Sequence, residues 1–370
     1  MKIAIVHDYI KEYGGAERVL ERLIKLYPTA DIYTSIYAPE FLGPHEKRFE
    51  NYEIKTTWLN KIPKRHKMLS PLRLLSPIAF KNLNLKGYDV IIVSQTGAYF
   101  PNFLRKSKKQ KIVCYTHTPP RYLYGYKTAR NLSQNVFVKA SSSVAFNILR
   151  IVDFEASKNV DVFIANSNEV KERIKKFYRR EATVIYPPVE VPSVVSSSFK
   201  LQASSYYVAG GRLARAKGMD VIVNAFVKNG KLLKIFGRGF AGYEEELKEK
   251  AKSQKVHVEF LGEIDDEKKF ELIAGAKAYI FASYDEDFGI TPVESMGVGT
   301  PVIAHKSGGV KETVIDGKTG VFYEPNSPES LNNAIEKFES LKLSVDACVQ
   351  QAEKFTEKEF DRKIKEAINA

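Results

Sequence analysis

Residues 281–304 read FASYDEDFGITPVESMGVGTPVIA, and this stretch decides the fold class. The apolar run at 278–283 that leads into it is typical of a buried strand. The following TPVESMGVG predicts the start of a helix, with Thr291 as N-cap and Pro292 at the first helical position. Gly289 lies in the turn between strand and helix. The sequence therefore predicts a strand–turn–helix unit.

Such a unit is a natural anion site. The free N–H groups of the turn and the positive end of the helix point at one place. Glu286 precedes that place, and Glu294 lies about one turn inside the helix. A phosphate flanked by two carboxylates that can bind hydroxyl groups fits a nucleotide attached to a sugar.

Further strands alternate with helices on both sides of this unit. In the first half, apolar runs predict strands at 2–7, 30–37, 88–95, 110–117, 160–167 and 181–188. In the second half, they predict strands at 206–211, 232–237, 256–262, 278–283, 300–305 and 320–325. Amphipathic helices are predicted at 14–28 and 217–228. Strands separated by helices indicate a parallel sheet with helices on both faces, so the fold class is α/β.

The chain divides at a stretch rich in proline and serine, PPVEVPSVVSSSFKLQASS at 187–205, which we interpret as a linker. We expect two doubly wound, Rossmann-like domains, residues 1–190 and 205–351, followed by a charged helical stretch. Ligands bind such sheets at the carboxyl ends of their strands. Two facing sheets would then form a cleft that suits an enzyme with two substrates.

Several polar residues follow these predicted strands. Gly15 belongs to a glycine pair that opens a helix, where backbone can approach an anion. His117 lies just after the run KIVCY (111–115) of a predicted strand, ahead of Arg121 and three tyrosines, which suit stacking on a sugar or a base. Arg212 and Lys217 lie on a turn where they can neutralise a diphosphate. Gly262 follows another strand, where backbone groups can read a base edge.

The positive charge is concentrated in the first half. The net charge is +13, and Ile54–Val152 holds 18 basic residues but one acidic residue, Asp89. Such a field attracts polyanions or an anionic membrane, unless it is a solvated surface. Apolar side chains among the cations suit a bilayer that holds a lipid-linked acceptor: Trp58, Leu59, Leu72, Leu74 and Leu75. A nucleic-acid-binding protein is a weaker alternative, because no zinc, RRM-type or recognition-helix signature is present.

Other features bound the compartment and the chemistry. Cys114 and Cys348, far apart in sequence, predict reduced, buried thiols. MKIAIVHDY enters a strand at once, so we expect no signal peptide, and no run of about 18 apolar residues spans a membrane. Acid clusters at 265–266 and 285–287 could bind a metal bridging a diphosphate. We expect no metal, because Arg212 and Lys217 already offer compensating charge.

Taken jointly, several motifs carry a resemblance. GGAERV (14–19), GRLARAKGMD (211–220), FLGEI (260–264), EDFGITPVE (286–294) and SGGVKETVIDGKTGVFYEP (307–325) resemble a retaining glycosyltransferase of family 4 with the GT-B fold, across nearly the whole chain. HTPPRYLYGY (117–126) is similar to a segment of bacterial and archaeal mannosyltransferases that build O-antigen and other surface polysaccharides.

The resemblance implies roles at the matching positions. Gly15 would approach the diphosphate or the acceptor, and His117 would contact the transferred sugar near its reacting carbon. Arg212 and Lys217 would hold the diphosphate. A last helix, at about 352–370, would pack back on the first, acceptor-side domain.

The remaining implied roles lie in the stretch quoted first. Glu286 would bind sugar hydroxyls beside the N–H groups of Phe288, Gly289 and Ile290, and Glu294 would hold the ribose. One departure is GRGFAG at 237–242, which lacks the proline usual in this turn of the family and leaves open which backbone groups bind near it.

The reaction expected from this resemblance is transfer of a hexose, mannose from GDP-mannose, to a hydroxyl acceptor with retention and without a metal or cofactor. No carboxylate qualifies as a nucleophile, so we expect a front-face path in which the leaving phosphate helps to remove the acceptor's proton. We expect a cytoplasmic protein and keep open a peripheral place on the inner face of the cell membrane. A nucleotide-sugar epimerase of the same fold is the alternative; a phosphorylase would need a Schiff-base lysine site, and none is evident.

Overall fold

The computed structural model describes residues 1–126, 136–190, 205–239, 242–252 and 257–369, without the side chains of 136–144. The chain forms two compact units. Unit 1 comprises Met1–Pro188 and Glu357–Ala370, and unit 2 comprises Val189–Thr356. Most of the predicted linker, 191–204, lies outside the described residues, as do residues 240–241 of the GRGFAG turn. Two α/β units confirm the predicted fold class.

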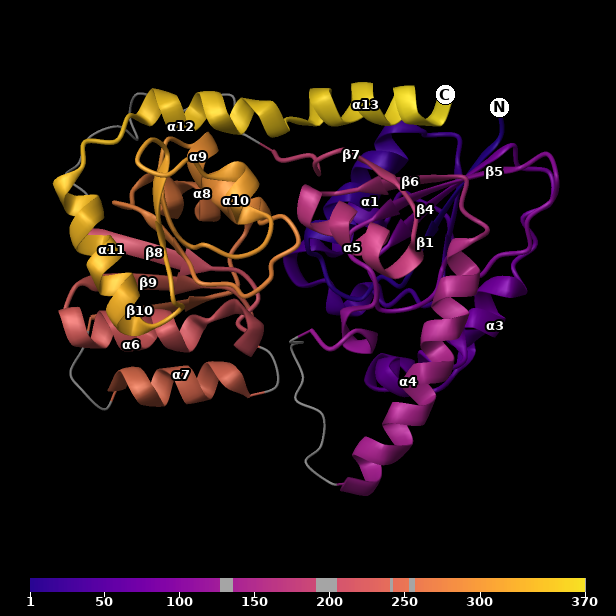
Figure 1. Cartoon of the computed structure of the whole chain (residues 1–370), viewed down its shortest axis with the longest axis horizontal. Helices are drawn as coiled ribbons and strands as arrows, with labels where there is room; N and C mark the ends of the chain where they lie inside the picture. The colour runs from indigo at the N-terminus through magenta and orange to yellow at the C-terminus, as the bar shows by residue number, and fades with distance from the viewer. Residues whose placement is uncertain (127–135, 191–204, 240–241, 253–256, 370) are drawn as a thin grey trace. The chain divides into compact units, whose positions relative to one another are not determined.

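Unit 1 contains a parallel sheet of seven strands in the order β3-β2-β1-β4-β5-β6-β7. Figure 1 labels β1, β4, β5, β6 and β7 of this sheet. The strands are β1 (Ile3–His7), β2 (Asp31–Thr34), β3 (Ile54–Thr56), β4 (Val90–Gln95), β5 (Lys111–Thr116), β6 (Val162–Ala165) and β7 (Ala182–Val184). The sequence patterns missed β3, because its three residues are all half-buried and show no alternation. The order reverses between β1 and β4, which makes that point of the sheet the expected ligand edge.

The helices of unit 1 cover both faces of this sheet. They are α1 (Gly15–Leu26), α2 (Leu69–Leu72), α3 (Ser76–Lys81), α4 (Val136–Ser157), α5 (Asn168–Tyr178) and α13 (Glu357–Asn369). Short 3-10 turns add η1 (Pro39–Phe41), η2 (Gly43–Phe49), η3 (Trp58–Lys61), η4 (Arg65–Lys67) and η5 (Arg121–Leu123). No helix of the described residues combines the length and the apolarity needed to cross a membrane.

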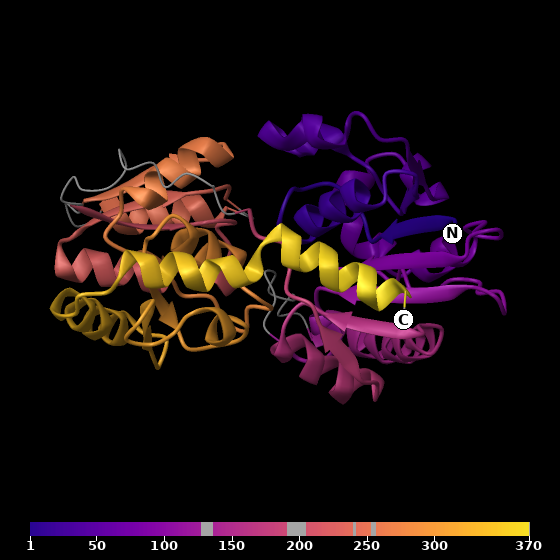
Figure 2. The ribbon, with the colours of Figure 1, turned by 90° about the horizontal axis from the view of Figure 1, so that it is seen from above.

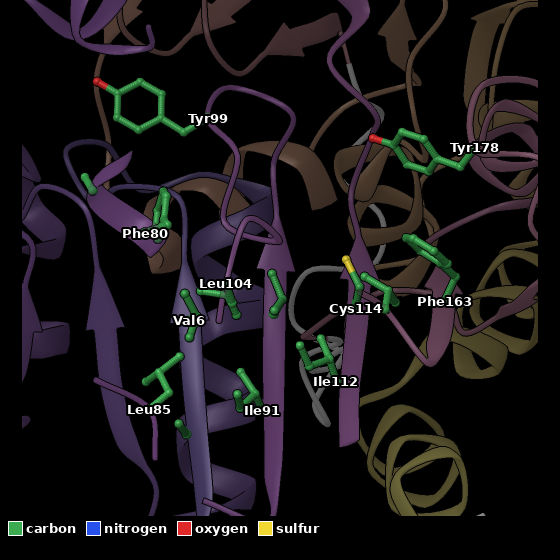
Figure 3. Packing of buried hydrophobic residues seen from close by; sticks show 14 of the residues in the cluster. Val6, Phe80, Leu85, Ile91, Tyr99, Leu104, Ile112, Cys114, Phe163 and Tyr178 are labelled. Carbon is green, nitrogen blue, oxygen red and sulfur yellow. The ribbon is translucent and has the colours of Figure 1, made fainter. Parts of the chain in front are cut away.

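One face of the unit 1 sheet packs against the α3 and α5 side. Figure 3 shows Val6, Ile91, Ile112 and Phe163 within this apolar core, with the sulfur of Cys114 among them. Cys114 and Cys348 are free and buried. Burial raises the pKa of the Cys114 thiol to about 12, so it is an inert core residue.

The other face of the unit 1 sheet carries α1 and α13. Figure 2 shows α13 lying across the strands of this unit. Phe360, Ile364 and Ile368, spaced four residues apart, are buried against β1, β4 and β5. Arg22 of α1 donates hydrogen bonds of 2.8 Å and 2.5 Å to the carboxylate of Asp361. The last helix is therefore part of the unit 1 core.

Unit 2 contains a parallel sheet of six strands in the order β10-β9-β8-β11-β12-β13. The strands are β8 (Tyr206–Gly210), β9 (Leu232–Phe236), β10 (Val258–Gly262), β11 (Tyr279–Phe281), β12 (Val302–His305) and β13 (Gly320–Tyr323). The helices are α6 (Met219–Asn229), α7 (Tyr243–Lys252), α8 (Asp266–Ala274), α9 (Ile290–Gly297), α10 (Val310–Thr313), α11 (Pro328–Ser340) and α12 (Val345–Ala352), with turns η6 (Arg215–Lys217) and η7 (Glu353–Phe355). This order reverses between β8 and β11, which is again the expected ligand edge.

Candidate functional site

The loop between β11 and α9 carries the acidic motif of unit 2. The helix begins at Ile290, with Gly289 as N-cap at a φ of 89°, so the expected N-cap at Thr291 and helix start at Pro292 are wrong. Glycine reaches the left-handed region without strain, and the chain therefore turns into the helix two residues earlier. Phe288 is buried against the ring of Phe355 at 5.5 Å and holds the loop to η7. The first N–H groups of the helix lack intrahelical partners, as at any helix start.

Lys217 and Glu286 meet at this edge. Lys217 ends η6, the turn after β8, and its Nζ lies 2.5 Å from Oε2 of Glu286. Both side chains are about one quarter exposed, at 26% and 23%. The N–H of Tyr284 donates to the carbonyl of Ala216 at 3.0 Å, so backbone also joins the two turns. A lysine, a carboxylate and a helix N-terminus thus occupy the reversal point of the unit 2 sheet.

The glycine pair Gly308-Gly309 supports the loop from the β12 side. The N–H of Gly309 donates to the carbonyl of Glu286 at 2.8 Å. A Cβ on Gly309 would lie 2.5 Å from the carbonyl oxygen of Asp287, so any larger residue would displace the loop. This close approach explains why glycines follow β12.

Glu294 lies beneath the helix N-terminus in a buried ion network. Its Oε1 accepts a 2.8 Å hydrogen bond from Nζ of Lys269, which also donates to Oδ1 of Asp266 at 2.8 Å. The side chains of Lys269 and Glu294 are only 8% and 3% exposed. Sequence reasoning missed Lys269. The available signal is its position four residues before the buried Ile273 on α8, because a lysine on an apolar helix face needs a buried partner.

The other predicted residues of unit 2 lie at the same edge. Arg212 is exposed on the turn that follows β8. Arg215 instead pairs with Glu246 at 2.5 Å. Gly262 ends β10 at a φ of 69° and accepts a 2.7 Å hydrogen bond from the N–H of Gly237. Its carbonyl is therefore engaged by the neighbouring turn.

In unit 1, His117 follows β5 and is 8% exposed. Its Nε2 lies 2.9 Å from Oγ of Ser94, and that oxygen lies 3.0 Å from Nδ1 of His7. Burial, aided by the nearby His7, lowers the pKa of His117 to about 3, so the ring is neutral. Gly15 is the first residue of α1 and is exposed, and the preceding Gly14 donates its N–H to Oε2 of Glu17 at 2.9 Å.

Asp8 is a second residue that sequence reasoning missed. It is fully buried, and its Oδ2 accepts hydrogen bonds from Thr96 Oγ1 at 2.6 Å and from the N–H groups of Ala98 and Tyr99 at 3.1 and 3.0 Å. Its Oδ1 has no hydrogen-bond partner in the part of the chain that the structure describes. Burial raises the pKa of Asp8. The signal was a polar pair, His7-Asp8, at the end of a buried strand.

The acidic residues at 265–266 have partners within the protein. Asp265 caps α8 by accepting from the N–H of Lys268 at 2.8 Å, and Asp266 pairs with Lys269. Among the described residues, no group of three or more His, Cys, Asp or Glu side chains is arranged to hold a metal ion.

Comparison with known proteins assigns the class. Residues 13–191 match the model of Glycosyltransferase Family 4, and residues 198–355 match that of Glycosyl transferases group 1. Two solved structures share the fold: the Anabaena protein HepE in complex with UDP (TM-score 0.69, 22% identity, all of both chains) and sucrose-phosphate synthase from Thermosynechococcus elongatus (TM-score 0.73, 19% identity, 99% of this chain and 98% of that one). The two doubly wound units are those of a GT-B glycosyltransferase.

The chain belongs to glycosyltransferase family 4. Among curated relatives, the alpha-1,3/1,6-mannosyltransferase ALG2 of Dictyostelium discoideum is 27% identical over 75% of this chain and 74% of its own length. The mouse protein of the same name is 24% identical over 74% of this chain and 71% of its own length.

Proposed function

We propose that this chain transfers mannose from GDP-mannose to a hydroxyl group of a lipid-linked or surface-polysaccharide glycan, with retention at the anomeric carbon. The observation that carries the proposal is the pairing of Lys217 with Glu286 beside the N-terminus of α9. It places a cation for a diphosphate and a carboxylate for sugar hydroxyls beside the positive end of a helix. The two ALG2 relatives, by their name, support mannose as the sugar.

In this proposal the ion pair is the resting state of the site. Lys217 turns to the diphosphate when the donor binds, and Glu286 is released to accept hydrogen bonds from the sugar. Arg212 and the N–H groups of Phe288, Gly289 and Ile290 add to the positive field. Groups aimed at the negative charge that develops on a leaving diphosphate typically contribute a few kcal/mol to the lowering of the barrier.

Glu294 would hold the ribose through its two oxygens. Lys269 fixes Oε1 at 2.8 Å and keeps the carboxylate in one orientation. A preorganised acceptor for two neighbouring hydroxyl groups loses little entropy on binding. In this scheme the base lies beside Gly262, whose carbonyl keeps its hydrogen bond from the N–H of Gly237. Gly15 and His117 of unit 1 serve the transferred sugar and the acceptor.

For the chemical step we propose a front-face path that needs neither metal nor cofactor. The leaving phosphate removes the acceptor's proton while the sugar passes through an oxocarbenium-like state. The cations and the helix N-terminus stabilise the leaving group in place of a metal. A glycosyl adduct trapped on a side chain, or activity abolished by a chelator and restored by a divalent ion, would contradict this path.

We also propose that unit 1 binds an anionic membrane surface that holds the acceptor lipid. Leu74 (53% exposed) lies between α2 and α3, and Ile78 (55%) lies on α3. Ile148 (57%) and Ile151 (65%) lie on α4. Exposed lysines of the same region supply charge complementary to anionic lipid: Lys61, Lys64, Lys67 and Lys81.

The apolar set expected from the sequence needs a correction. Leu59 and Leu72 are 0% and 3% exposed and belong to the core of unit 1, so they cannot touch a bilayer. Leu59 lies in η3 next to the exposed Trp58, and Leu72 ends α2, two residues before the exposed Leu74. The membrane surface is therefore smaller than the sequence predicts.

The decisive experiment measures donor choice and product together. The purified full chain is titrated with GDP-mannose, UDP-glucose, UDP-galactose and UDP-N-acetylglucosamine, and is then incubated with GDP-mannose and a polyprenyl-diphosphate-linked disaccharide. We expect GDP-mannose to bind at least about tenfold more tightly than the other nucleotide sugars, a difference of about 1.4 kcal/mol in binding free energy. We expect NMR to identify the product as an α-mannoside. Tighter binding of a UDP-sugar would overturn the donor. An epimerised nucleotide sugar formed without acceptor would favour the epimerase.

A further inference from the structure

Four buried polar side chains form a line across the carboxyl edge of the unit 1 sheet. Oε1 of Glu17 lies 3.7 Å from Nε2 of His7. Nδ1 of His7 lies 3.0 Å from Oγ of Ser94, which lies 2.9 Å from Nε2 of His117. Their exposed fractions range from 0% to 8%. The line runs from α1 through the ends of β1 and β4 to the residue after β5.

The backbone fixes this line. His7 and Ser94 are direct partners in the parallel pairing of β1 with β4. The N–H of His117 donates to the carbonyl of Gln95 at 2.9 Å, which places the imidazole beside Ser94. Glu17 is held in turn by the N–H of Gly14, which donates to its Oε2 at 2.9 Å. The order of the four groups is thus set by strand register and a helix cap.

The order of these groups has a chemical consequence. A neutral imidazole has one N–H and one lone pair, and a hydroxyl has one hydrogen to donate. Among the described residues Nε2 of His7 has no hydrogen-bond partner, but the carboxylate of Glu17 lies 3.7 Å from it. The negative charge of that carboxylate favours a proton on Nε2, and Nδ1 then accepts from the hydroxyl of Ser94. The oxygen of Ser94 in turn accepts from Nε2–H of His117. The lone pair of His117 is left on Nδ1.

The reverse arrangement is disfavoured by one contact. If His117 carried its proton on Nδ1, Ser94 would donate to Nε2 of His117 and His7 would donate to Ser94. The lone pair on Nε2 of His7 would then face the oxygens of Glu17, which is repulsive in a buried site of low dielectric. The charge of Glu17 therefore favours one direction of the hydrogen bonds along the line.

We propose that Glu17, His7 and Ser94 are positioning residues that hold His117 in the Nε2–H tautomer, so that Nδ1 acts as a hydrogen-bond acceptor for a sugar hydroxyl group. Among the described residues, none forms a hydrogen bond with Nδ1 of His117. The inference rests on the proposed role of His117 at the sugar. In this inference, neutral His117 recognises a hydroxyl group of the substrate by accepting its hydrogen bond at Nδ1. A substrate that lacks this hydroxyl group would leave a buried lone pair unpaired.

The test reads the tautomer directly. The full chain is labelled with ¹⁵N-histidine, and two-bond correlations report which ring nitrogen of each of the six histidines is protonated. The His117 signals are assigned by their loss in His117→Gln. We expect the Nε2–H form in the wild type and in Ser94→Thr, which retains the hydroxyl group. In Ser94→Ala we expect both tautomers.

Activity provides the second readout. We expect kcat for mannosyl transfer to fall about tenfold in Ser94→Ala, the equivalent of one hydrogen bond, and to stay near wild type in Ser94→Thr. A wild-type His117 in the Nδ1–H form, or an unchanged tautomer in Ser94→Ala, overturns the inference. Because the spectrum is recorded without substrate, the wild-type result stands even if the transfer reaction proves to be a different one, and GDP-mannose titration tests that separately.

Discussion

Lys217 and Glu286 form an ion pair, with Nζ and Oε2 2.5 Å apart, although the residues are 69 positions apart in sequence. They come together because β8 and β11 are neighbours at the reversal point of the unit 2 sheet. In the proposed function, Lys217 exchanges Glu286 for the diphosphate of the donor, and Glu286 exchanges Lys217 for hydroxyl groups of the sugar. The pair therefore makes a prediction that separates catalysis from stability.

Lys217→Ala should lower kcat/KM for GDP-mannose by about a hundredfold, because it removes one cation from the leaving diphosphate. The free energy of unfolding should change by about 1 kcal/mol or less, as is usual for a partly exposed pair. Lys231→Ala is the matched control, since Lys231 pairs with Glu339 at 2.9 Å with both side chains 33% exposed. Equal losses of activity in both variants would contradict a role for Lys217 at the diphosphate.

Lys269→Met should destabilise the protein by about 3–5 kcal/mol, because it leaves the buried carboxylate of Glu294 without its cation. Adding Glu294→Gln should restore much of the stability, but nucleotide affinity should stay low because the ribose acceptor is lost. Urea unfolding and calorimetric titration with GDP measure the two effects. Full recovery of GDP binding in the double variant would show that Glu294 does not hold the ribose.

Phe360→Ala should cost about 3–5 kcal/mol, because it opens a cavity where α13 packs on the unit 1 sheet. Lys365→Ala, at an exposed position on the same helix, should change stability by less than about 0.5 kcal/mol. Thermal unfolding of both variants makes the comparison. Similar midpoints would mean that α13 contributes little to the core of unit 1.

Asp153 predicts a pH dependence. It accepts hydrogen bonds from Tyr178 and Tyr124 at 3.1 Å, and burial raises its pKa to about 7. The folded state therefore binds a proton more tightly than the unfolded state, whose Asp pKa is about 4. Its contribution to stability is complete below pH ~4 and falls as pH rises to about 7. Asp8, whose pKa is also raised, acts in the same direction.

Asp153→Asn should remove the Asp153 part of this dependence. Relative to the variant, the wild type should lose free energy of unfolding between about pH 4 and pH 7 and run parallel to it above about pH 8. Urea unfolding at several pH values measures the difference. A wild type that gains stability relative to the variant over this range would show that Asp153 is a charged, paired carboxylate.

Vesicle binding tests the membrane surface. The double variant Leu74→Asp/Ile78→Asp should bind vesicles containing phosphatidylglycerol more weakly, and high salt should weaken the wild type. Ile315→Asp is the control, since Ile315 is 38% exposed but lies in unit 2. Salt-insensitive binding, or equal effects of the two variants, would contradict the assigned surface.

Sequence patterns revealed most of the sheet, because buried parallel strands are continuous apolar runs such as VIIVSQ at 90–95. They missed β3, and they placed the start of α9 two residues too late, because Gly289 and not Thr291 makes the turn. Pairing with β2 defines β3, whereas the left-handed turn at Gly289 sets the start of α9. Sequence patterns report local composition, so they do not reveal a short strand such as β3 that shows no alternation.

The candidate site shows the same division. Glu286 and Glu294 were visible as a spaced motif, but their partners, Lys217 and Lys269, are 69 and 25 residues away in sequence. The line from Glu17 to His117 joins three strand ends and a helix, and no spacing rule connects them. Which residues bear charge can be read from the chain, and which of them neutralise one another requires the fold.

The packing of α13 on the unit 1 sheet also has a consequence for biosynthesis. Unit 1 is completed by residues 357–369, which leave the ribosome only after the whole of residues 189–356. Until then, the strands that pack against Phe360, Ile364 and Ile368 expose apolar side chains to solvent. During synthesis, unit 1 therefore cannot complete its core until residues 357–369 have been made. Translation rate and chaperone supply should govern the yield of folded protein.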